Sequence, residues 1–367
     1  MVITSNVFNL NKSDYQNTPL FLGDSQGLVD TVNRQYPALW NLYKKMKSLD
    51  WDESEFDYSS CIRDFKICPK NTYDAMIKTL AWQWEADSIA SRNIAPVLAP
   101  FISSTELWAL WQRISDNEMI HALTYSEIVK GSFEDPNEIL QEILSIKEAH
   151  ARLDTVAELF DALYNVSHEY ALGGIDKDDT SVYDTIFLGV VALYVLERIQ
   201  FINSFAITFG ICETGAFNPI GKAVQKIAQD EFEVHCKTDR TVLDIELQTE
   251  KGKSAFNRLK SIITKVVNEV VESEIEWAKY VLPEGHDLVG LNQDLLIKWC
   301  LFNANELFVY FGIEHDYDIP SKNPLKYMEN WLNISDTQVS PQEEKTGAYM
   351  LGQFINNDSD KIYELDI

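Results

Sequence analysis

The chain has 367 residues, and its 57 Asp and Glu against 31 Lys and Arg give a formal net charge of −26. Such an acidic chain is not expected to bind nucleic acid or an anionic membrane. Hydrophobic residues make up 46%, with only 15 Gly and 11 Pro. This composition excludes disordered and collagen-like chains and favours a packed, mainly helical protein.

Targeting and redox signals are absent from the sequence. The five cysteines are too scattered for a disulfide framework or a CxxC metal motif, so we expect reduced thiols. The N-terminal segment has neither the basic-then-apolar pattern of an export signal nor an Arg-rich organelle signal, which predicts a cytoplasmic protein. The most apolar stretch, TIFLGVVALYVL at 185–196, has 12 residues. Because a bilayer span takes about 20 residues, this stretch predicts a buried helix.

From about residue 30 to 315, apolar residues recur at the three- to four-residue spacing of helices. Two helix starts carry capping signals: Ser103 with Glu106 has the spacing of a capping box, and Asp135 precedes Pro136 as an N-cap would. Helices are predicted near 30–47, 71–95, 104–130, 136–151, 154–172, 182–208, 219–242, 254–281 and 292–312. No strand pattern or internal repeat competes, so we expect one all-α domain over 1–315, with an N-terminal arm of about 1–30.

The composition changes at about residue 316. Pro320, Pro324 and Pro341 accompany a polar, acidic tail over 316–367, which is not expected to form a regular helix. Two interpretations stay open, a disordered tail or a partner-binding segment. The second is suggested by its apolar and aromatic residues, which are Tyr349, Met350, Leu351, Phe354, Ile362, Tyr363 and Ile367.

Two predicted helices carry an acid and a histidine about one turn apart. Glu118 precedes His121 by three, so both side chains share a helical face and can reach one metal ion. In QDEFEVHC, Glu231 precedes His235 by four and shares its face, whereas Glu233 points away on a regular helix. We therefore favour Glu231 over Glu233 as a ligand. A solvated acid beside a core histidine is the ordinary alternative for either pair.

Two further helices carry one acid each in apolar surroundings. Glu197 lies within FLGVVALYVLERIQFINSF and Asp87 within WQWEADSIASR. Either acid alone could be a surface or salt-bridge residue, but a buried carboxylate is costly unless it is paired or coordinated. One acid from each of two helices, with an acid–histidine pair from each of two others, is the ligand set of ferritin-like di-iron and di-manganese bundles. Such oxygen-rich ligands with two imidazoles suit Fe or Mn.

With these residues the chain resembles the small (β) subunit of class I ribonucleotide reductase, in the ferritin-like superfamily. The resemblance covers nearly the whole chain, from FLGD near residue 21 to the tail. It is carried by QWEADSIASR at 83–92, NEMIHALTY at 117–125, LERIQFINSF at 196–205, IAQDE at 227–231, GLNQDLL at 290–296, NPLKYMENWLN at 323–333 and VSPQEEKTGAYMLGQ at 339–353.

The resemblance implies an oxidoreductase subunit that acts only with the large (α) subunit to make deoxyribonucleotides from ribonucleoside diphosphates for DNA replication. Two Fe ions, oxo-bridged when oxidised, or Mn, would react with O2 and oxidise Tyr125 to a stable tyrosyl radical. Tyr125 lies one turn after His121 and so faces the same site. Phe201, Phe205 and Ile227 would shield the radical. The implied metal ligands are Asp87, Glu118, His121, Glu197, Glu231 and His235.

The resemblance also implies that the radical is passed to a cysteine of the large subunit. Trp51, Asp230 and His121 would carry it inside this subunit, and Tyr349 would relay it from the tail. Glu343 matches a tail acid associated with this transfer, and the C-terminal residues would dock onto the large subunit. The family forms homodimers, which the long apolar helices would also suit.

The chain departs from the family pattern at one place. Members usually have Asp-Glu-x-x-His, whereas here one extra residue separates the pair Asp230 and Glu231 from His235. A π-bulge would absorb this residue and keep Glu231 and His235 together on the metal. If Glu233 takes the site instead, Asp230 need not match the transfer route.

Two other functions compete with the reductase subunit. A ferritin-like di-metal oxidase, hydroxylase or desaturase would need neither Tyr125 nor the tail with Tyr349. A non-catalytic iron-binding bundle would also use carboxylates, but such chains are usually much shorter. Tyr125 and the tail phrase together favour the reductase subunit.

Overall fold

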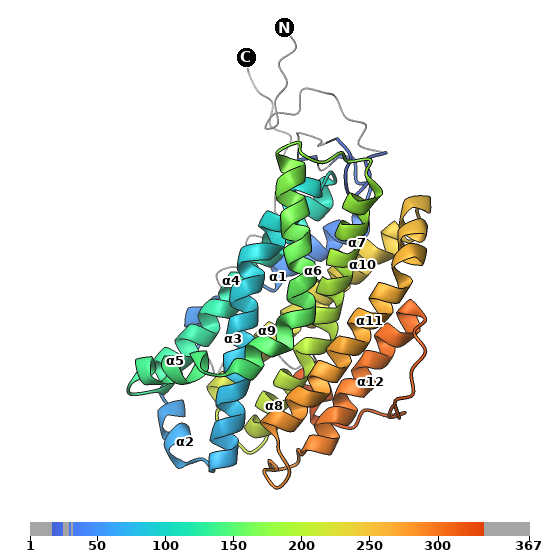
Figure 1. The fold of residues 1–367 in the computed structure, drawn as a ribbon. Helices are drawn as coiled ribbons and strands as arrows, with labels where there is room; N and C mark the ends of the chain where they lie inside the picture. Colours follow the sequence, from blue (N-terminus) through green and yellow to red (C-terminus); the bar gives the residue numbers. More distant parts are fainter. Residues whose placement is uncertain (1–16, 25–28, 31, 334–367) are drawn as a thin grey trace, which may run out of the picture.

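The computed structural model describes residues 17–24, 29–30 and 32–333. Among these residues no β-strand forms, and only two isolated bridges are present, Phe21 with Ile102 and Leu288 with Leu291. Figure 1 shows the long helices lying side by side along the long dimension of the molecule. The predicted all-α bundle is therefore confirmed.

The helices follow the predicted order, with a few differences in their bounds. They are α1 (Pro37–Ser48), α2 (Cys61–Ile67), α3 (Lys70–Leu98), α4 (Thr105–Ser132), α5 (Pro136–Leu144), α6 (Lys147–Ala171), α7 (Thr180–Val195), α8 (Ile202–Cys212), α9 (Asn218–Asp230), α10 (Cys236–Glu246), α11 (Glu250–Val281), α12 (Gln293–Phe311) and α13 (Tyr327–Trp331). Two π-helical turns, η3 (Leu196–Gln200) and η4 (Glu231–His235), join α7 to α8 and α9 to α10.

One of the two predicted helix caps is confirmed and the other is wrong. Asp135 caps α5, since its carboxylate accepts hydrogen bonds from the backbone of Asn137 and Glu138. The cap of α4 is Ser104 rather than Ser103, because the Ser104 hydroxyl accepts from the Leu107 N–H at 3.1 Å. The hydroxyl of Ser103 instead donates to the carbonyl of Pro19. Adjacent serines leave such a cap ambiguous by one residue.

Other helix boundaries also differ from the prediction. The first helix begins at Pro37 and not near residue 30, since the ring of a proline at the first position suits a helix start. The break predicted near 152–153 lies at Ser145 and Ile146. Helix α2 was not predicted, because its seven residues are too few to show a helical period.

The helical run around the apolar stretch at 185–196 extends well beyond that stretch, in agreement with the helix predicted near 182–208. The helix continues through η3, so that Thr180–Cys212 forms one run of 33 residues that is long and apolar enough to cross a membrane by composition alone. However, 83% of the residues in its most apolar window are buried inside the protein. This run is the centre of the bundle, and it places the residues of η3 deep in the core.

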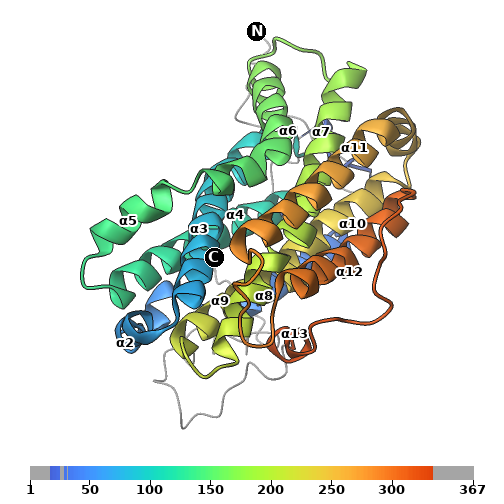
Figure 2. The same ribbon diagram turned by 60° about the horizontal axis from the view of Figure 1, so that its bottom comes forward.

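Helix α13 packs against α8 at one end of the bundle (Figure 2). The indole of Trp331 stacks on Phe209 with 4.6 Å between ring centroids, and the hydroxyl of Tyr327 donates to the carbonyl of Ala206 at 2.7 Å. Gly210 allows this approach, because a Cβ there would lie 3.0 Å from the hydroxyl oxygen of Tyr327. A short helix within the predicted irregular tail is thus a correction to the prediction.

Candidate metal centre

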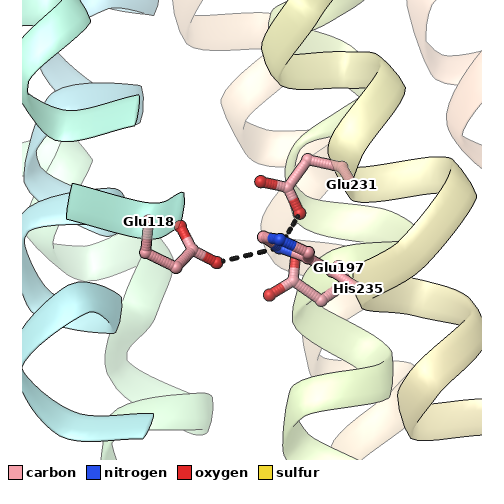
Figure 3. A group of neighbouring side chains, drawn as sticks. All are labelled: Glu118, Glu197, Glu231 and His235. Atoms are coloured by element: carbon pink, nitrogen blue, oxygen red, sulfur yellow. Dashed lines mark ion pairs between the residues drawn. The ribbon is translucent and has the colours of Figure 1, made fainter. Parts of the chain in front are cut away.

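Six side chains from four helical segments meet in the core. Asp87 comes from α3, Glu118 and His121 from α4, Glu197 from η3, and Glu231 and His235 from η4. They form two groups, Asp87, Glu118 and His121 in one, and Glu118, Glu197, Glu231 and His235 in the other, with the possible ligand atoms of each group within 4.8 Å of one another. Glu118 belongs to both groups, which is the arrangement that two neighbouring ions require. Figure 3 shows the second group.

These side chains are buried and yet lack hydrogen bonds at the atoms that face one another. Both oxygens of Asp87, Glu118 and Glu231 have no hydrogen-bond partner within the described residues, and the same holds for the Nδ1 atoms of His121 and His235. Each buried polar group left unsatisfied costs about 1–3 kcal/mol. Carboxylate oxygens and imidazole nitrogens that converge and face mainly one another fit a pair of metal ions such as Fe or Mn.

The pKa shifts of the cluster residues also fit a bound cation. Burial raises the pKa of Asp87 and Glu197 well above the usual range, and neighbouring carboxylates raise it further. Burial would lower the pKa of His235, but the carboxylates of Glu231 and Glu118 raise it to about 10. Without a cation the cluster therefore holds protons to balance its carboxylates, and a bound metal would take their place.

The π-helical turn η4 decides which acid of QDEFEVHC faces the cluster. A carboxylate oxygen of Glu231 lies 3.0 Å from Nδ1 of His235 (Figure 3). The carboxylate of Glu233 pairs instead with Lys45 and, at 2.8 Å, with Lys237, outside the cluster. A π-turn is present where the one-residue insertion predicted it, and it brings Glu231 and His235 to one side of the helix.

A hydrogen-bonded chain leads from the cluster to Trp51. The indole N–H of Trp51 donates to Oδ2 of Asp230 at 2.7 Å, and Nε2 of His121 lies 3.2 Å from the same oxygen. The rings of Trp51 and His121 are stacked with their centroids 6.0 Å apart. The structure thus brings together the three residues of the route that the sequence analysis expected inside this subunit.

Tyr125 lies fully buried beside the cluster. Burial raises the pKa of Tyr125 well above its ordinary value, and the nearby carboxylates of Asp87 and Glu231 add to this rise. Its hydroxyl has no hydrogen-bond partner in the part of the chain that the structure describes. The predicted shielding residues are also buried: the rings of Phe201 and Phe205 stack with centroids 5.8 Å apart, and Ile227 has no exposed surface.

Two polar residues of the site were missed by the sequence analysis. Asn117 lies between Asp230 and His235 and hydrogen-bonds both. Asp239, four residues after His235, is buried near the metal cluster, and burial raises its pKa well above the usual range. The spacing of Asp239 from His235 could have identified it, whereas an amide such as Asn117 has no distinctive sequence signal. Glu343 and Tyr349 lie outside the described residues.

Known proteins share this fold. A protein from Clostridium botulinum described as a ribonucleotide reductase R2 subunit superposes with a TM-score of 0.77 at 19% identity, covering 89% of this chain and 98% of that one. A Streptococcus sanguinis protein titled dimanganese(II)-NrdF gives a TM-score of 0.66 at 14% identity, covering 83% of this chain and 99% of that one. At such identities the likeness establishes only that these proteins share the fold of this helical bundle.

Sequence comparison identifies the family. The protein named ribonucleoside-diphosphate reductase subunit beta from Buchnera aphidicola subsp. Schizaphis graminum is 26% identical, over 98% of this chain and 99% of its own length. The family described as "Ribonucleotide reductase, small chain" matches residues 29–324, a range that contains all six residues of the cluster. The chain therefore belongs to the ribonucleotide reductase small-chain family, as its sequence motifs predicted.

Proposed function

We propose that the buried cluster holds two metal ions and that this centre generates a tyrosyl radical on Tyr125. As a small chain of its family, the protein is the β subunit of a ribonucleoside-diphosphate reductase, an oxidoreductase that works with a large subunit. The observation that carries the metal site is the convergence of buried ligand atoms without hydrogen bonds. The ligands would be Asp87, Glu118, His121, Glu197, Glu231 and His235.

We propose iron as the metal, with manganese as the alternative. The two ions share a preference for carboxylate and imidazole ligands, so both fit the cluster. The Streptococcus sanguinis neighbour is titled a dimanganese(II) protein, which supports the manganese alternative at the level of the fold. When bound, such a centre supplies the redox chemistry, with O2 as oxidant, that removes one electron from a nearby side chain.

The surroundings of Tyr125 suit a stable radical. Because the phenol is fully buried, a charged phenolate or radical cation is strongly disfavoured there. Tyr125 would therefore lose its phenolic proton together with the electron and become a neutral radical, and the nearby carboxylate of Asp87 would accept the proton. Phe201, Phe205 and Ile227 would exclude water and reductants, a role that their complete burial in the same core supports.

Trp51, Asp230 and His121 would connect this radical to the partner. The carboxylate of Asp230 accepts from the indole of Trp51 and lies beside His121, so it can hold both rings in a fixed geometry. Tyr349 and Glu343 would continue the route in the tail, which would dock onto the large subunit. Both tail residues lie outside the described residues.

We also propose that the protein forms a homodimer and is located in the cytoplasm. Helix α4 exposes Trp108, Met119 and Leu123, each 42% exposed, and α3 exposes Ile89. The spacing of the three α4 residues places them along one helical face. An apolar stripe of this kind on the surface of a helix is typical of a subunit interface.

Electron paramagnetic resonance tests the central proposal. The native chain and Tyr125→Phe are each reconstituted with Fe(II) and O2, and metal content is measured in both. We expect a tyrosyl signal in the native chain only, with equal metal in the two proteins. A signal that survives the substitution would exclude Tyr125 as its source. Metal binding without a radical, both with iron and with manganese and a flavoprotein activator, would favour a di-metal oxidase.

A further inference from the structure

Asn117 bridges two parts of the metal centre that would otherwise be separate. Its Nδ2 donates to Oδ2 of Asp230 at 3.0 Å, and its Oδ1 lies 2.9 Å from Nε2 of His235. The side chain is 1% exposed, so water does not compete for these contacts. Through Asn117 the histidine of η4 is joined to the carboxylate that already contacts His121 and Trp51.

The chemistry of these groups leaves one arrangement of the amide. A carboxylate only accepts hydrogen bonds, so the NH2 group of Asn117 must face Asp230. The amide oxygen then faces His235, and because this oxygen only accepts, Nε2 of His235 must carry the proton. The reversed amide would place its oxygen against the carboxylate of Asp230, which is repulsive.

The same logic applies to the other histidine. Nε2 of His121 faces Oδ2 of Asp230 at 3.2 Å and must also carry its proton. Nδ1 is therefore the nitrogen that each histidine would offer to a metal ion: that of His121 lies 3.1 Å from Glu231, and that of His235 lies 3.1 Å from Glu118. One acid, Asp230, thus orients His121 directly and His235 through Asn117.

We propose that Asn117 is a positioning residue for the metal held by His235, a role that rests on the proposed metal site. The amide fixes the tautomer and the ring orientation of His235. The amide has this role because His235 is the last residue of the π-helical turn η4. The wider backbone of this turn does not position the histidine ring as a regular α-helical turn would. Groups that orient a metal-bound histidine in this way typically change metal affinity about 10- to 100-fold when they are removed.

Anaerobic Mn(II) titration followed by electron paramagnetic resonance tests the role without any turnover. The native chain should bind two Mn(II) and show the spectrum of a coupled pair. Asn117→Leu keeps the branched shape of the side chain, although it is somewhat larger, and removes both hydrogen bonds. We expect it to retain one tight site, to weaken the second about 10- to 100-fold, and to show the six-line spectrum of an isolated Mn(II).

Two further variants separate positioning from packing. Asn117→Gln keeps both the donor and the acceptor of the amide, so two Mn(II) should still bind tightly. Asn303→Leu removes another buried amide, which hydrogen-bonds Trp299 and Arg198, and it should also bind two. If Asn117→Leu does not fold, Asn117→Ala takes its place with the same expectation.

Each remaining outcome has one meaning. Two tight Mn(II) sites in Asn117→Leu or its replacement would overturn the role of Asn117, and so would an equal loss of the second site in Asn303→Leu or in Asn117→Gln. If the native chain itself fails to bind two ions, the proposed metal site fails first and the role of Asn117 fails with it. The native titration therefore distinguishes the two failures.

Discussion

Glu231 and Glu233 stand two residues apart in η4 and have opposite surroundings. Glu231 is fully buried, and the imidazole of His235 holds its pKa well below the usual range although burial opposes this. Glu233 is partly exposed and pairs with Lys45 and Lys237. Glu231 can therefore bind a metal ion in the core, whereas Glu233 forms ion pairs at the surface.

This contrast gives a prediction with its own control. Glu231→Gln should lower the metal content of the reconstituted chain from two ions to one or none, because an amide is a poorer ligand than a carboxylate. Glu233→Gln should leave two ions bound and change stability by at most about 1 kcal/mol, as expected for a partly exposed ion pair. Metal analysis by mass spectrometry measures both. Loss of metal in Glu233→Gln alone would reverse the assignment.

Most of the candidate site could be predicted from the sequence, because its acids and histidines lie at fixed helical spacings. Glu118 and His121 share a face at i,i+3, and the family phrases identify Asp87 and Glu197. Asn117 could not be found, since its role depends on residues more than 100 positions away in η4 and α9. Contacts of that kind exist only after folding.

At the scale of elements, η3 is held in place by a buried ion pair. Arg152 of α6 donates to both carboxylate oxygens of Glu274 in α11 and to the backbone carbonyl of Gln200, the last residue of η3. The guanidinium contacts the faces of two indoles, 3.8 Å from the ring centroid of Trp82 and 4.6 Å from that of Trp277. These contacts satisfy a carbonyl at the end of the wider π-turn that carries Glu197.

Replacing Arg152 should strongly lower the free energy of unfolding. Arg152→Met leaves the carboxylate of Glu274 buried without its partner, which typically costs about 3–5 kcal/mol of unfolding free energy. Arg258→Met is the control, because Arg258 forms an exposed pair with Asp184 that should contribute less than about 1 kcal/mol. Chemical denaturation of the metal-free chains measures both. Equal losses would show that Arg152 is no more important than a surface residue.

A second ion cluster ties α12 to η3 and gives a pH dependence. Burial opposes ionisation of Glu306, but Arg198, at 2.8 Å, together with Tyr194 and Arg240 lowers the pKa of Glu306 below its ordinary value. The folded pKa lies below the unfolded one, so the stabilisation is present above about pH 4.5. It is lost as the pH falls through the lower, folded value.

Glu306→Gln should therefore lower the melting temperature at pH 7 and have a progressively smaller effect as the pH falls below 4.5. Because Glu306 is 44% exposed, solvent screening keeps the effect small. Thermal unfolding of both chains across pH 3.5–7 checks this. A difference between the two chains that is constant over the whole range would show that the ionised carboxylate is not what stabilises the fold.

The elements themselves were largely predictable, with informative exceptions. Long helices such as α4 and α11 can be recognised in the sequence, because the helical spacing of their apolar residues repeats many times. The π-turn η4 was expected from an extra residue in a family pattern, but η3 was not, because no insertion marks it. Its wider turn is stabilised by Arg152, whose partner Glu274 lies 122 residues further along the chain.

At the scale of the whole molecule, the exposed stripe on α4 allows a test of assembly. Trp108→Glu places a charge on the proposed interface of a chain that already carries −26, so two copies should no longer associate. The native chain should sediment at twice 42.1 kDa and the variant at 42.1 kDa. Val309→Glu is the control, since Val309 is 73% exposed on α12. Dissociation by the control, or a dimeric Trp108→Glu, would contradict the interface.

The proposed metal ligands are spread from residue 87 to residue 235, over four helical segments. No short stretch of the unfolded chain holds more than two of them, so only the assembled bundle can bind metal tightly. Binding to the folded state alone adds about 2.7 kcal/mol of stability at a metal concentration 100 times Kd. With the proposed metal site, a cell short of metal would hold fewer intact chains as well as less of the proposed radical, because the metal-free protein would unfold and be degraded more often.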